Sequence, residues 1–534
     1  MNLTCGEFLV RQLQAWGVDT VFGIPGVHTV ELYRGLPGSN IRHVTPRHEQ
    51  GAGFMADGYA RVSGKPGVCF IITGPGMTNI LTAMAQAYAD SIPMLVISSV
   101  NERHRLGLGN GYLHELPDQL TMTAGVTAFS HRLMSVEALP AVLARAFAVF
   151  DGARPRPVHI ELPLDVITAP AGHLQIRQRP RVSRPAADPA LISAAAERLQ
   201  RARRPLLLLG GGCVGALNQA QALAEALDAP TALTINAKGL LPPEHPLLLG
   251  SNQSLEPVRQ LVREADVVLA IGTELGETDY DVVFDGGFVI KGELIRIDID
   301  AEQLSRNAAA TLAIQADARL AMQQLLDALP GKPLASDSPG TQRAWAARMA
   351  LVDGFEGWAH YQTLFDTLLC ALPQARFVGD STQTVYSGNH LVDTASPRRW
   401  FNSATGYGTL GYGLPAAIGA KLADPSSPVV CLIGDGGLQF SLPELASAVE
   451  AGVGIIVLLW NNHGYGEIKR YMQRRDITPM GVDIHSPDFL TIARGFGCVA
   501  ERARDHAHLS ELLREAPADR PLLIELMEAP PFHP

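Results

Sequence analysis

The chain has little of what would point to a nucleic acid, an anionic membrane or an oxidising compartment. Its 534 residues carry a formal net charge of −10 and no run of basic residues, which argues against both kinds of anionic partner. The six cysteines lie far apart without a CxxC pair, as in a protein with reduced thiols rather than a disulfide framework. We therefore expect a cytoplasmic protein that binds neither nucleic acid nor membrane.

Long uninterrupted apolar runs are also missing. The apolar stretch of residues 80–100 is broken by Asp90 and Pro93 and divides into a helix and a strand, so it does not predict a membrane span. Residues 5–16 carry Glu7 and Arg11 and lack the basic start and cleavage site of a secretory signal. Nothing in these segments changes the expectation of a cytoplasmic location.

Composition and length predict several compact α/β domains. Hydrophobic residues make up 47% of the chain and charged residues 18%, the balance of a globular protein large enough for roughly three domains. Stretches rich in proline and polar residues at about 168–188 and 330–341 read as linkers. We predict three doubly wound parallel-sheet domains at 1–170, 188–330 and 345–534, the first and last being two versions of one unit.

The most informative motif lies in the last of these domains. Residues 428–433 and 454–460 read as buried strands, and Ser441-Leu-Pro-Glu444 between them reads as a capping box that opens a helix. The two strands of such a βαβ unit run parallel, so Asp435 and Asn462, which follow them, should meet at one edge of the sheet.

This edge is predicted to hold a magnesium diphosphate. A carboxylate from Asp435, an amide oxygen from Asn462 and the carbonyl of Gly464 would leave magnesium positions for phosphate oxygens and water. Close approach of the backbone to a diphosphate is favoured by Gly434, Gly436 and Gly437. A second set of diphosphate contacts is predicted from the polar run after residues 377–378, namely Ser381, Thr382 and Gln383.

These motifs resemble those of enzymes that use thiamine diphosphate, in the group of acetolactate synthases, pyruvate oxidases and 2-oxo acid decarboxylases. The likeness extends from end to end. It includes FGIPG at residues 22–26, RHEQGAGFMADGYAR at 47–61, TGPGMTN at 73–79 and FNSATGYGTLGYGLPAAIGA at 401–420. The resemblance implies a pyrimidine-side first domain, a central Rossmann-like domain and a diphosphate-side last domain.

The resemblance also implies roles for single residues. Glu49 would contact a ring nitrogen of the cofactor's aminopyrimidine and start the proton transfer that activates the thiazolium. Burial would raise the pKa of such a carboxyl, which suits a proton shared with a ring nitrogen. Leu410 would hold the two cofactor rings folded together, and the carbonyl of Gly408 would accept a hydrogen bond from the aminopyrimidine. Because the family builds each site from the first domain of one chain and the last of another, a homodimer or homotetramer is implied.

The central domain contains a motif that could mislead. Gly210-Gly-Gly-Cys-Val-Gly215 follows the strand 205–209 and fits the GxGxxG pattern of dinucleotide binding. No acidic residue ends the next strand, where one would hold a ribose. In the family this domain carries FAD in acetolactate synthases and pyruvate oxidases and is empty in many decarboxylases. We expect it to be empty here, with bound FAD as the alternative.

The substrate is predicted from the region that follows the first-domain strands. His114 lies where decarboxylases keep a histidine pair, and a neutral imidazole there could relay a proton. His28 is a second candidate for this role.

Glu467, Glu115 and Asp118 could face a cationic substrate tail, because a carboxylate makes paired contacts with a guanidinium. Within the family, the amino-terminal segments look most like decarboxylases of 5-guanidino-2-oxopentanoate in arginine catabolism.

We therefore predict a non-oxidative decarboxylase of a small 2-oxo acid, with thiamine diphosphate and Mg²⁺ as cofactors. The expected reaction converts 5-guanidino-2-oxopentanoate to 4-guanidinobutanal and carbon dioxide. Two alternatives stay open at this point. One is an acetolactate synthase acting on pyruvate, and the other is a non-catalytic thiamine-binding homologue, which would have no need of Glu49.

Overall fold

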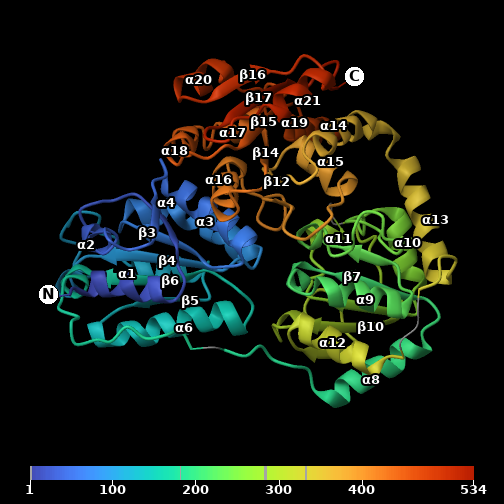
Figure 1. Ribbon diagram of the computed structural model, residues 1–534, viewed down its shortest axis with the longest axis horizontal. Coiled ribbons are helices and arrows are strands. Elements are labelled where there is room, and N and C mark those ends of the chain that lie inside the picture. Colours follow the sequence, from blue (N-terminus) through green and yellow to red (C-terminus); the bar gives the residue numbers. More distant parts are fainter. Residues whose placement is uncertain (1–2, 181, 282–284, 331–333, 534) are drawn as a thin grey trace.

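The chain forms three α/β lobes, each built on one parallel sheet (Figure 1). A computed structural model describes residues 3–180, 182–281, 285–330 and 334–533. The first domain lies on the left of Figure 1, the central domain on the right and the last domain at the top. The predicted fold class is confirmed.

The first domain carries a sheet of six parallel strands in the order β2-β1-β3-β4-β6-β5. Its strands are β1 Thr20–Gly23, β2 Arg42–Val44, β3 Gly67–Ile71, β4 Met94–Val100, β5 Phe129–Arg132 and β6 Val158–Pro163. Its helices are α1 Cys5–Ala15, α2 Val30–Arg34, α3 Glu49–Ser63, α4 Pro75–Ala89, α5 Gln119–Ala124, α6 Leu139–Gly152 and α7 Leu164–Ile167. Apolar side chains of alternate strand positions enter two cores, one on each face of the sheet, as in a doubly wound domain.

The last domain repeats this topology. Its order, β13-β12-β14-β15-β17-β16, is that of the first domain when each set is numbered from its own first strand. The strands are β12 Arg376–Gly379, β13 Trp400–Asn402, β14 Val429–Gly434, β15 Ile456–Asn461, β16 Val499–Arg502 and β17 Leu522–Met527. The helices are α14 Ala359–Ala371, α15 Gln383–Leu391, α16 Gly413–Ala423, α17 Asp435–Leu438, α18 Glu444–Glu450, α19 Gly466–Arg474, α20 Phe489–Gly495 and α21 His506–Arg514. The expectation of two versions of one unit is confirmed.

The central domain has five parallel strands in the order β11-β10-β9-β7-β8. They are β7 Pro205–Leu209, β8 Thr231–Leu233, β9 Val267–Ile271, β10 Glu293–Asp298 and β11 Leu312–Gln315. Helices α8 Pro189–Arg201, α9 Leu217–Leu227 and α12 Ala318–Ala328 cover one face, and α10 Glu256–Glu264 and α13 Pro339–Gly354 cover the other. Counted from its own first strand the order is 2-1-3-4-5, one of the two common doubly wound arrangements.

Helix α13 shifts the second domain boundary from its predicted place. The linker was expected to run to about residue 341 and the last domain to start at 345. Instead α13 begins at Pro339, capped by the Ser338 side chain, which accepts a hydrogen bond from the backbone of Thr341. The helix buries Ala344, Ala347 and Leu351 in the core of the central domain. A capping serine followed by proline is a helix start, so the boundary falls after α13.

The apolar stretch of residues 80–100 divides as predicted, since α4 ends at Ala89 and β4 begins at Met94. Across the ranges that the structure describes, no helix has the length and apolar character needed to cross a bilayer. All six cysteines are unpaired, as expected. Five are buried and Cys370 is exposed.

The predicted capping box at Ser441 is wrong. Helix α18 begins at Glu444 after Pro443, and no side chain caps its first turn. Within the described part of the chain, the Ser441 hydroxyl has no hydrogen-bond partner. The Glu444 carboxylate, which would have closed the box, accepts hydrogen bonds from the backbone of Arg47 and His48 in the first domain. A tertiary contact has replaced the local one.

The first and last domains are joined where α3 crosses α16. A Cβ added to Gly58 would lie 2.0 Å from the carbonyl oxygen of Ala416, and one added to Gly419 would lie 1.9 Å from that of Met55. The two backbones therefore touch without intervening side chains. One apolar core extends from the first-domain sheet through both helices to the last-domain sheet.

Replacing Gly58 with alanine should separate the two helices, because the new Cβ has no room beside Ala416. We expect a loss of about 1–3 kcal/mol in the free energy of unfolding, as for other overpacked cores, seen as a lower urea midpoint. Gly125→Ala is the matched control, since a Cβ there meets no atom within 4 Å. Equal urea midpoints for the two variants would contradict this account.

Candidate functional site

The predicted metal ligands lie together at the carboxyl edge of the last-domain sheet. Strands β14 and β15 pair in parallel with Gly434 opposite Trp460, so Asp435 and Asn462 follow neighbouring strands. Asp435 is 1% exposed, and its Oδ1 accepts a long hydrogen bond of 3.4 Å from the Asn462 backbone N–H. Burial raises the pKa of the Asp435 carboxyl. A nearby cation would offset that cost of burial.

Asn462 presents an unused oxygen at this edge. Its Oδ1 is buried and has no hydrogen-bond partner within the ranges that the structure describes. A Cβ added to Gly466 would lie 2.4 Å from Asn462 Nδ2, so the glycine leaves room for the amide. A buried amide oxygen without a donor, beside a buried carboxylate, is the oxygen set that Mg²⁺ prefers. The residues present therefore fit the metal.

Glycines allow the surrounding loops to close on this point. Gly464 has φ +152°, and a Cβ there would lie 2.3 Å from the carbonyl oxygen of Val482. The three glycines predicted to contact the diphosphate also lie close to neighbouring loops, on the side where a Cβ would project. An added Cβ would lie 2.9 Å from Thr382 Oγ1 at Gly434, 2.7 Å from the Tyr465 ring at Gly436 and 3.1 Å from Asp380 Oδ1 at Gly437.

The polar run after β12 has a member that the sequence analysis missed. Asp380 is fully buried and accepts hydrogen bonds from the backbone of Ser381 at 2.8 Å and of Gly413, at the start of α16, at 3.1 Å. Burial raises its pKa to about 6. The sequence signal for Asp380 is the buried strand β12, which ends directly before it. Asp380 thus fixes the loop that carries Ser381 and Thr382.

Gln383 connects this run to Glu467. Its Nε2 donates a hydrogen bond to the Glu467 carboxylate, which brings the start of α15 against the start of α19. Glu467 also pairs with Arg474 at 3.1 Å and with Arg470 at 3.7 Å, and its side chain is 40% exposed. It therefore lies at the rim of the metal edge with guanidinium groups already beside it.

The loop that carries Gly408 and Leu410 is held from both domains. Gly408 has φ +77°, and its N–H donates to the Ser403 carbonyl at 3.0 Å. Thr409 donates from its backbone and its hydroxyl to Gln86 of α4, at 3.3 and 3.1 Å. Leu410 itself is half-buried, which leaves part of its apolar side chain free to contact a ligand.

Glu49 begins α3 at the edge of the first domain. Its Oε2 accepts a hydrogen bond of 2.9 Å from Asn79 Nδ2 on α4, and its Oε1 lies 3.3 Å from where a Cβ of Gly76 would be. Asn79 stood inside the TGPGMTN motif, but the sequence analysis assigned it no role. It holds one oxygen of Glu49 and leaves the other beside a glycine.

His28 and His114 form a pair that the sequence analysis did not predict. The two rings meet edge to face with centroids 5.1 Å apart. In the described part of the chain, neither Nδ1 has a hydrogen-bond partner, and both are buried. Burial and the neighbouring His114 lower the pKa of His28. The pair is packed against the TGPG turn, where a Cβ of Gly74 would lie 2.6 Å from the His114 carbonyl.

The two other acidic candidates are occupied by their own loops. Glu115 accepts hydrogen bonds from the backbone of Gly109, Gly111 and Tyr112 at 2.8–3.0 Å. Asp118 caps α5 through Thr121, whose hydroxyl and backbone N–H lower the carboxylate's pKa. That they face a substrate tail stays a prediction, and short loops already use these carboxylates to satisfy backbone N–H groups.

The candidate residues thus form two groups. His28 and His114 lie on loops that follow first-domain strands, and Glu49 begins the helix after another of these strands. Asp435 and Asn462 follow last-domain strands. Among the residues that the structure describes, no hydrogen bond or ion pair joins one group to the other within the chain. The two groups belong to different domains, as predicted.

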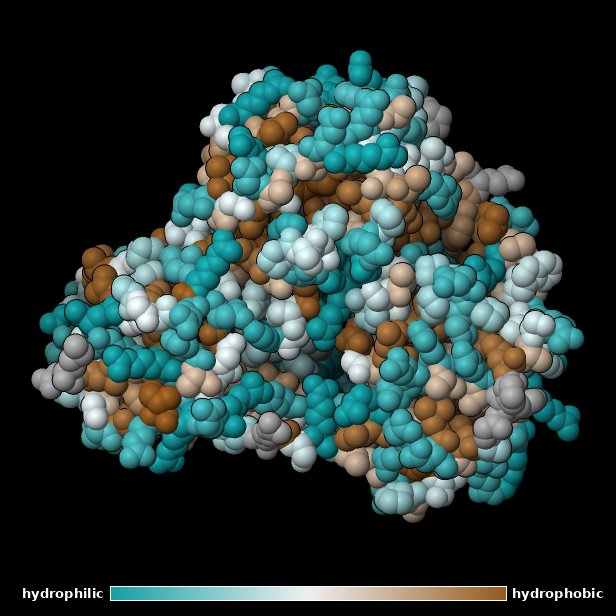
Figure 2. Space-filling model, viewed as in Figure 1, coloured by the Kyte–Doolittle hydropathy of each residue, from teal (hydrophilic) through white to brown (hydrophobic). Residues whose placement is uncertain are grey.

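A separate cavity of about 360 Å³ lies where the three domains meet, away from both groups. The space-filling view shows the hollow between the lobes, with hydrophilic residues at its rim (Figure 2). Residues of the GxGxxG segment line it, together with Asp279 and Asp298. Burial raises the pKa of Asp279 to about 6 and also raises that of Asp298.

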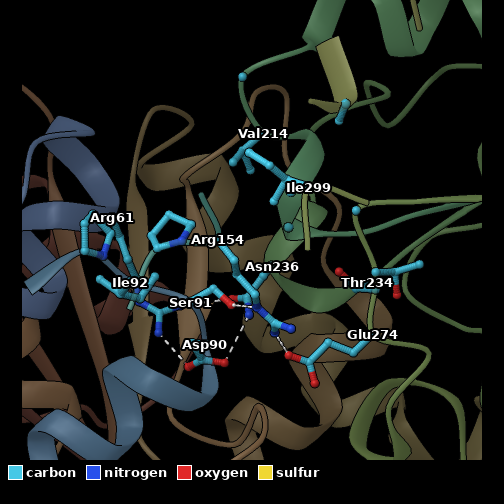
Figure 3. Close-up of a pocket in the computed structure, with 18 of the residues that line it drawn as sticks. Arg61, Asp90, Ser91, Ile92, Arg154, Val214, Thr234, Asn236, Glu274 and Ile299 are labelled. Carbon is cyan, nitrogen blue, oxygen red and sulfur yellow. Dashed lines mark hydrogen bonds and ion pairs between the residues drawn. The ribbon is translucent and has the colours of Figure 1, made fainter. Parts of the chain in front are cut away.

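Three of the arginines that line this cavity, Arg61, Arg154 and Arg184, are paired with carboxylates, and Figure 3 labels the first two. Arg61 contacts Asp57 and Asp90 at 2.6 Å each, and Asn236 bonds to both Arg61 and Asp90. Arg154 pairs with Glu274 across the domain boundary. Positive charge that could meet a cofactor's phosphates is thus largely neutralised by the protein itself.

Comparison with known proteins agrees with the division of the chain into three domains. Three family models match in order: the thiamine pyrophosphate enzyme N-terminal TPP binding domain at residues 3–122, the central domain at 192–325 and the C-terminal TPP binding domain at 380–526. A "Probable 2-ketoarginine decarboxylase AruI" of Pseudomonas aeruginosa is 50% identical over 524 residues, covering 96% of this chain and 92% of the relative.

More distant relatives are acetolactate synthases. The "Acetolactate synthase isozyme 1 large subunit" of Escherichia coli is 33% identical, over 97% of this chain and 93% of the relative. The "Probable acetolactate synthase large subunit" of Methanocaldococcus jannaschii is 31% identical, over 98% and 92%. With all three domains matched in order, the chain belongs to the thiamine pyrophosphate enzymes.

Proposed function

We propose that the protein decarboxylates 5-guanidino-2-oxopentanoate, which is 2-ketoarginine, to 4-guanidinobutanal and carbon dioxide with the help of thiamine diphosphate. The observation that carries this proposal is the 50% identity, over 96% of the chain, to a relative named as a probable 2-ketoarginine decarboxylase. Identity to the E. coli acetolactate synthase is 33%. The paired histidines at the first-domain edge agree with a decarboxylase.

Asp435, Asn462 and the Gly464 carbonyl are the groups we assign to Mg²⁺. The main support is the buried Asn462 Oδ1, which has no hydrogen-bond partner among the described residues, since such an oxygen is costly without a donor or a cation. Main-chain N–H groups of Gly434, Gly436 and Gly437, with Ser381, Thr382 and Gln383, would hold the diphosphate. The cofactor held by these residues would supply a nucleophilic thiazolium carbon and an acceptor for the electron pair released with carbon dioxide.

Glu49 would hold a proton against a ring nitrogen of the aminopyrimidine. The Asn79 amide fixes one of its oxygens, so the other is oriented toward the ligand. Leu410 would pack between the two rings of the cofactor, and the Gly408 carbonyl would accept a hydrogen bond from the amino group. Each of these residues would orient one part of the cofactor or hold a proton next to one of its atoms.

His28 and His114 would relay the proton that replaces the departing carboxylate. The lowered pKa keeps His28 neutral at pH 7, and a neutral imidazole both accepts and donates a proton. Among the described residues, each ring has a buried Nδ1 without a hydrogen-bond partner, which would be available to a substrate oxygen.

Glu467 is the acidic residue we assign to the guanidinium tail. Its contacts with Arg470 and Arg474 are the kind of pairing that a guanidinium substrate would make. Glu115 and Asp118 are not assigned, because their oxygens are used by backbone N–H groups. The central domain is proposed to work without FAD, since Arg61 and Arg154 at the cavity are already paired with carboxylates.

We also propose a homodimer or homotetramer located in the cytoplasm. The assembly follows from the family's shared sites and agrees with the two separate groups of candidate residues. The location is supported by six unpaired cysteines, which are typical of a reducing compartment.

Product analysis tests the reaction. The purified protein with thiamine diphosphate and Mg²⁺ should release carbon dioxide and 4-guanidinobutanal from 5-guanidino-2-oxopentanoate, detected by trapping the aldehyde and by mass spectrometry. Pyruvate alone should yield little acetolactate. Acetolactate as the main product, with no guanidino aldehyde, would establish the synthase alternative, and binding of the cofactor without turnover of either acid would establish the non-catalytic one.

Charge recognition is tested with Glu467→Gln. The value of kcat/KM for the guanidino acid should fall by roughly 10- to 100-fold, because a charge-assisted contact of about 1–3 kcal/mol is lost. Turnover of 2-oxohexanoate, an uncharged acid, should change far less. Asp483→Asn is the control, an exposed carboxylate paired with Lys469 of the same helix. An equal fall for both substrates would remove Glu467 from tail recognition.

Two variants separate proton transfer from metal binding. Glu49→Gln should retain the cofactor but slow deuterium exchange at the thiazolium carbon by roughly 100-fold or more, because the acid–base group is gone. Asp435→Asn should instead weaken retention of Mg²⁺ and cofactor together, measured by equilibrium dialysis. Normal exchange in the Glu49 variant would show that the proton is handled elsewhere.

The same two variants test the assembly. If each complete site combines Glu49 of one chain with Asp435 of another, mixing the inactive proteins should restore part of the activity after subunit exchange. A fully active monomer in analytical ultracentrifugation would refute shared sites.

A further inference from the structure

Glu444 of the last domain reaches across the domain boundary to the start of α3. Its carboxylate accepts the backbone N–H of Arg47 at 3.0 and 3.1 Å and that of His48 at 3.1 Å. The Ser447 hydroxyl donates to Oε2 at 2.6 Å. The side chain is buried, with 1% of Glu444 exposed. A carboxylate nearly 400 positions away in the sequence thus organises the entry to the helix that Glu49 begins.

These contacts satisfy groups that the helix cannot satisfy itself. The first N–H groups of a helix and of the residues leading into it have no partner inside the helix. At α3 the His48 ring accepts the N–H of Gln50, and Glu444 accepts those of the two residues before Glu49. A carboxylate at this end is also favoured by the helix dipole. Glu49 therefore lies between two capping contacts.

Gly51 makes the room for this carboxylate. A Cβ at position 51 would lie 2.2 Å from Glu444 Oε1 and 2.7 Å from its Cδ. The carboxyl group is thus pressed against the first turn of α3 at the place where a side chain is missing. Neither residue can move without disturbing the backbone on either side of Glu49.

The charge around Glu444 is modest. Arg47 is the charged residue of the first domain that faces it, and its guanidinium pairs with Glu450 of α18. Burial raises the pKa of Glu444 to about 7, so its protonated form is well populated near neutral pH. A protonated carboxyl still has a carbonyl oxygen that accepts the two backbone N–H groups.

We infer that Glu444 is a positioning residue for Glu49. By clamping residues 47 and 48 from the diphosphate-side domain of the same chain, it sets the position from which the Glu49 carboxyl reaches the aminopyrimidine. The inference rests on the role proposed for Glu49. Contacts of Glu444 go to the backbone of Arg47 and His48 and to the Ser447 hydroxyl, and we assign none of these groups to the metal or the diphosphate.

The test compares three variants of the full-length protein loaded with thiamine diphosphate and Mg²⁺. Glu444→Ala removes the clamp, whereas Glu444→Gln keeps the shape and one accepting oxygen. Glu450→Gln is the control, because it removes the charge that pairs with the Arg47 guanidinium and leaves the contacts of Glu444 with the Arg47 and His48 backbone in place. Deuterium exchange at the thiazolium carbon, cofactor affinity, kcat and KM are measured for each, with circular dichroism as the check on folding.

We expect Glu444→Ala to slow exchange and lower kcat by roughly 10- to 100-fold, as for a small displacement of a catalytic group. Cofactor affinity and KM should change by less than about threefold, because their contacts lie elsewhere. Glu444→Gln should recover most of the rate, and Glu450→Gln should match the wild type. A structural defect alone would lower cofactor affinity in step with kcat.

Two outcomes would overturn the inference. One is a folded Glu444→Ala variant that exchanges at the wild-type rate. The other is a Glu444→Gln variant as slow as the alanine variant, because the shape of the clamp would then not be what matters. Glu49→Gln, measured alongside, separates this from a failure of the proposed function. If that variant exchanges normally, the role of Glu49 is wrong; if it is slow while Glu444→Ala is normal, only the positioning role fails.

Discussion

The close contact of α3 with α16 is the constraint on which the rest of the structure depends. Gly58 and Gly419 let the two backbones touch, and one core continues from the first sheet to the last. Beside this contact lies a buried polar network in which Asp57 accepts from Arg61 and from Tyr412 at 2.6 Å each. Removing one member of such a buried pair costs about 3–5 kcal/mol, so the crossing is held by shape and by charge.

The crossing determines which functional groups can meet. Helix α3 carries Glu49 at its first residue, and α16 begins beside Asp380, which orders the loop after β12. Each helix therefore brings one group of candidate residues to the boundary between the first and last domains. The cavity between the three domains lies at the other end of α3, where Arg61 is paired. The candidate residue Glu49 and the cavity are thus at opposite ends of one helix.

Several features could be predicted from local sequence because they depend on neighbouring residues. The strands that precede Asp435 and Asn462 are apolar runs of a length that only a buried strand explains, and parallel pairing then brought both residues to one edge. The linker near residue 180 and the division of residues 80–100 followed from proline and charge. The capping box at Ser441 and the boundary at 345 failed, because tertiary packing used Glu444 and α13 differently.

The sequence by itself determined the three α/β units, the family motifs and the residue types available for metal, diphosphate and proton transfer. Periodicity and strand-end chemistry are local properties, and they need no knowledge of distant segments. Only the tertiary structure decided that His28 meets His114, that Glu115 and Asp118 serve their own loops, and that Glu444 caps α3. Such contacts form where a buried N–H group or ring nitrogen has no local partner. Which groups these are depends on how the separate domains pack.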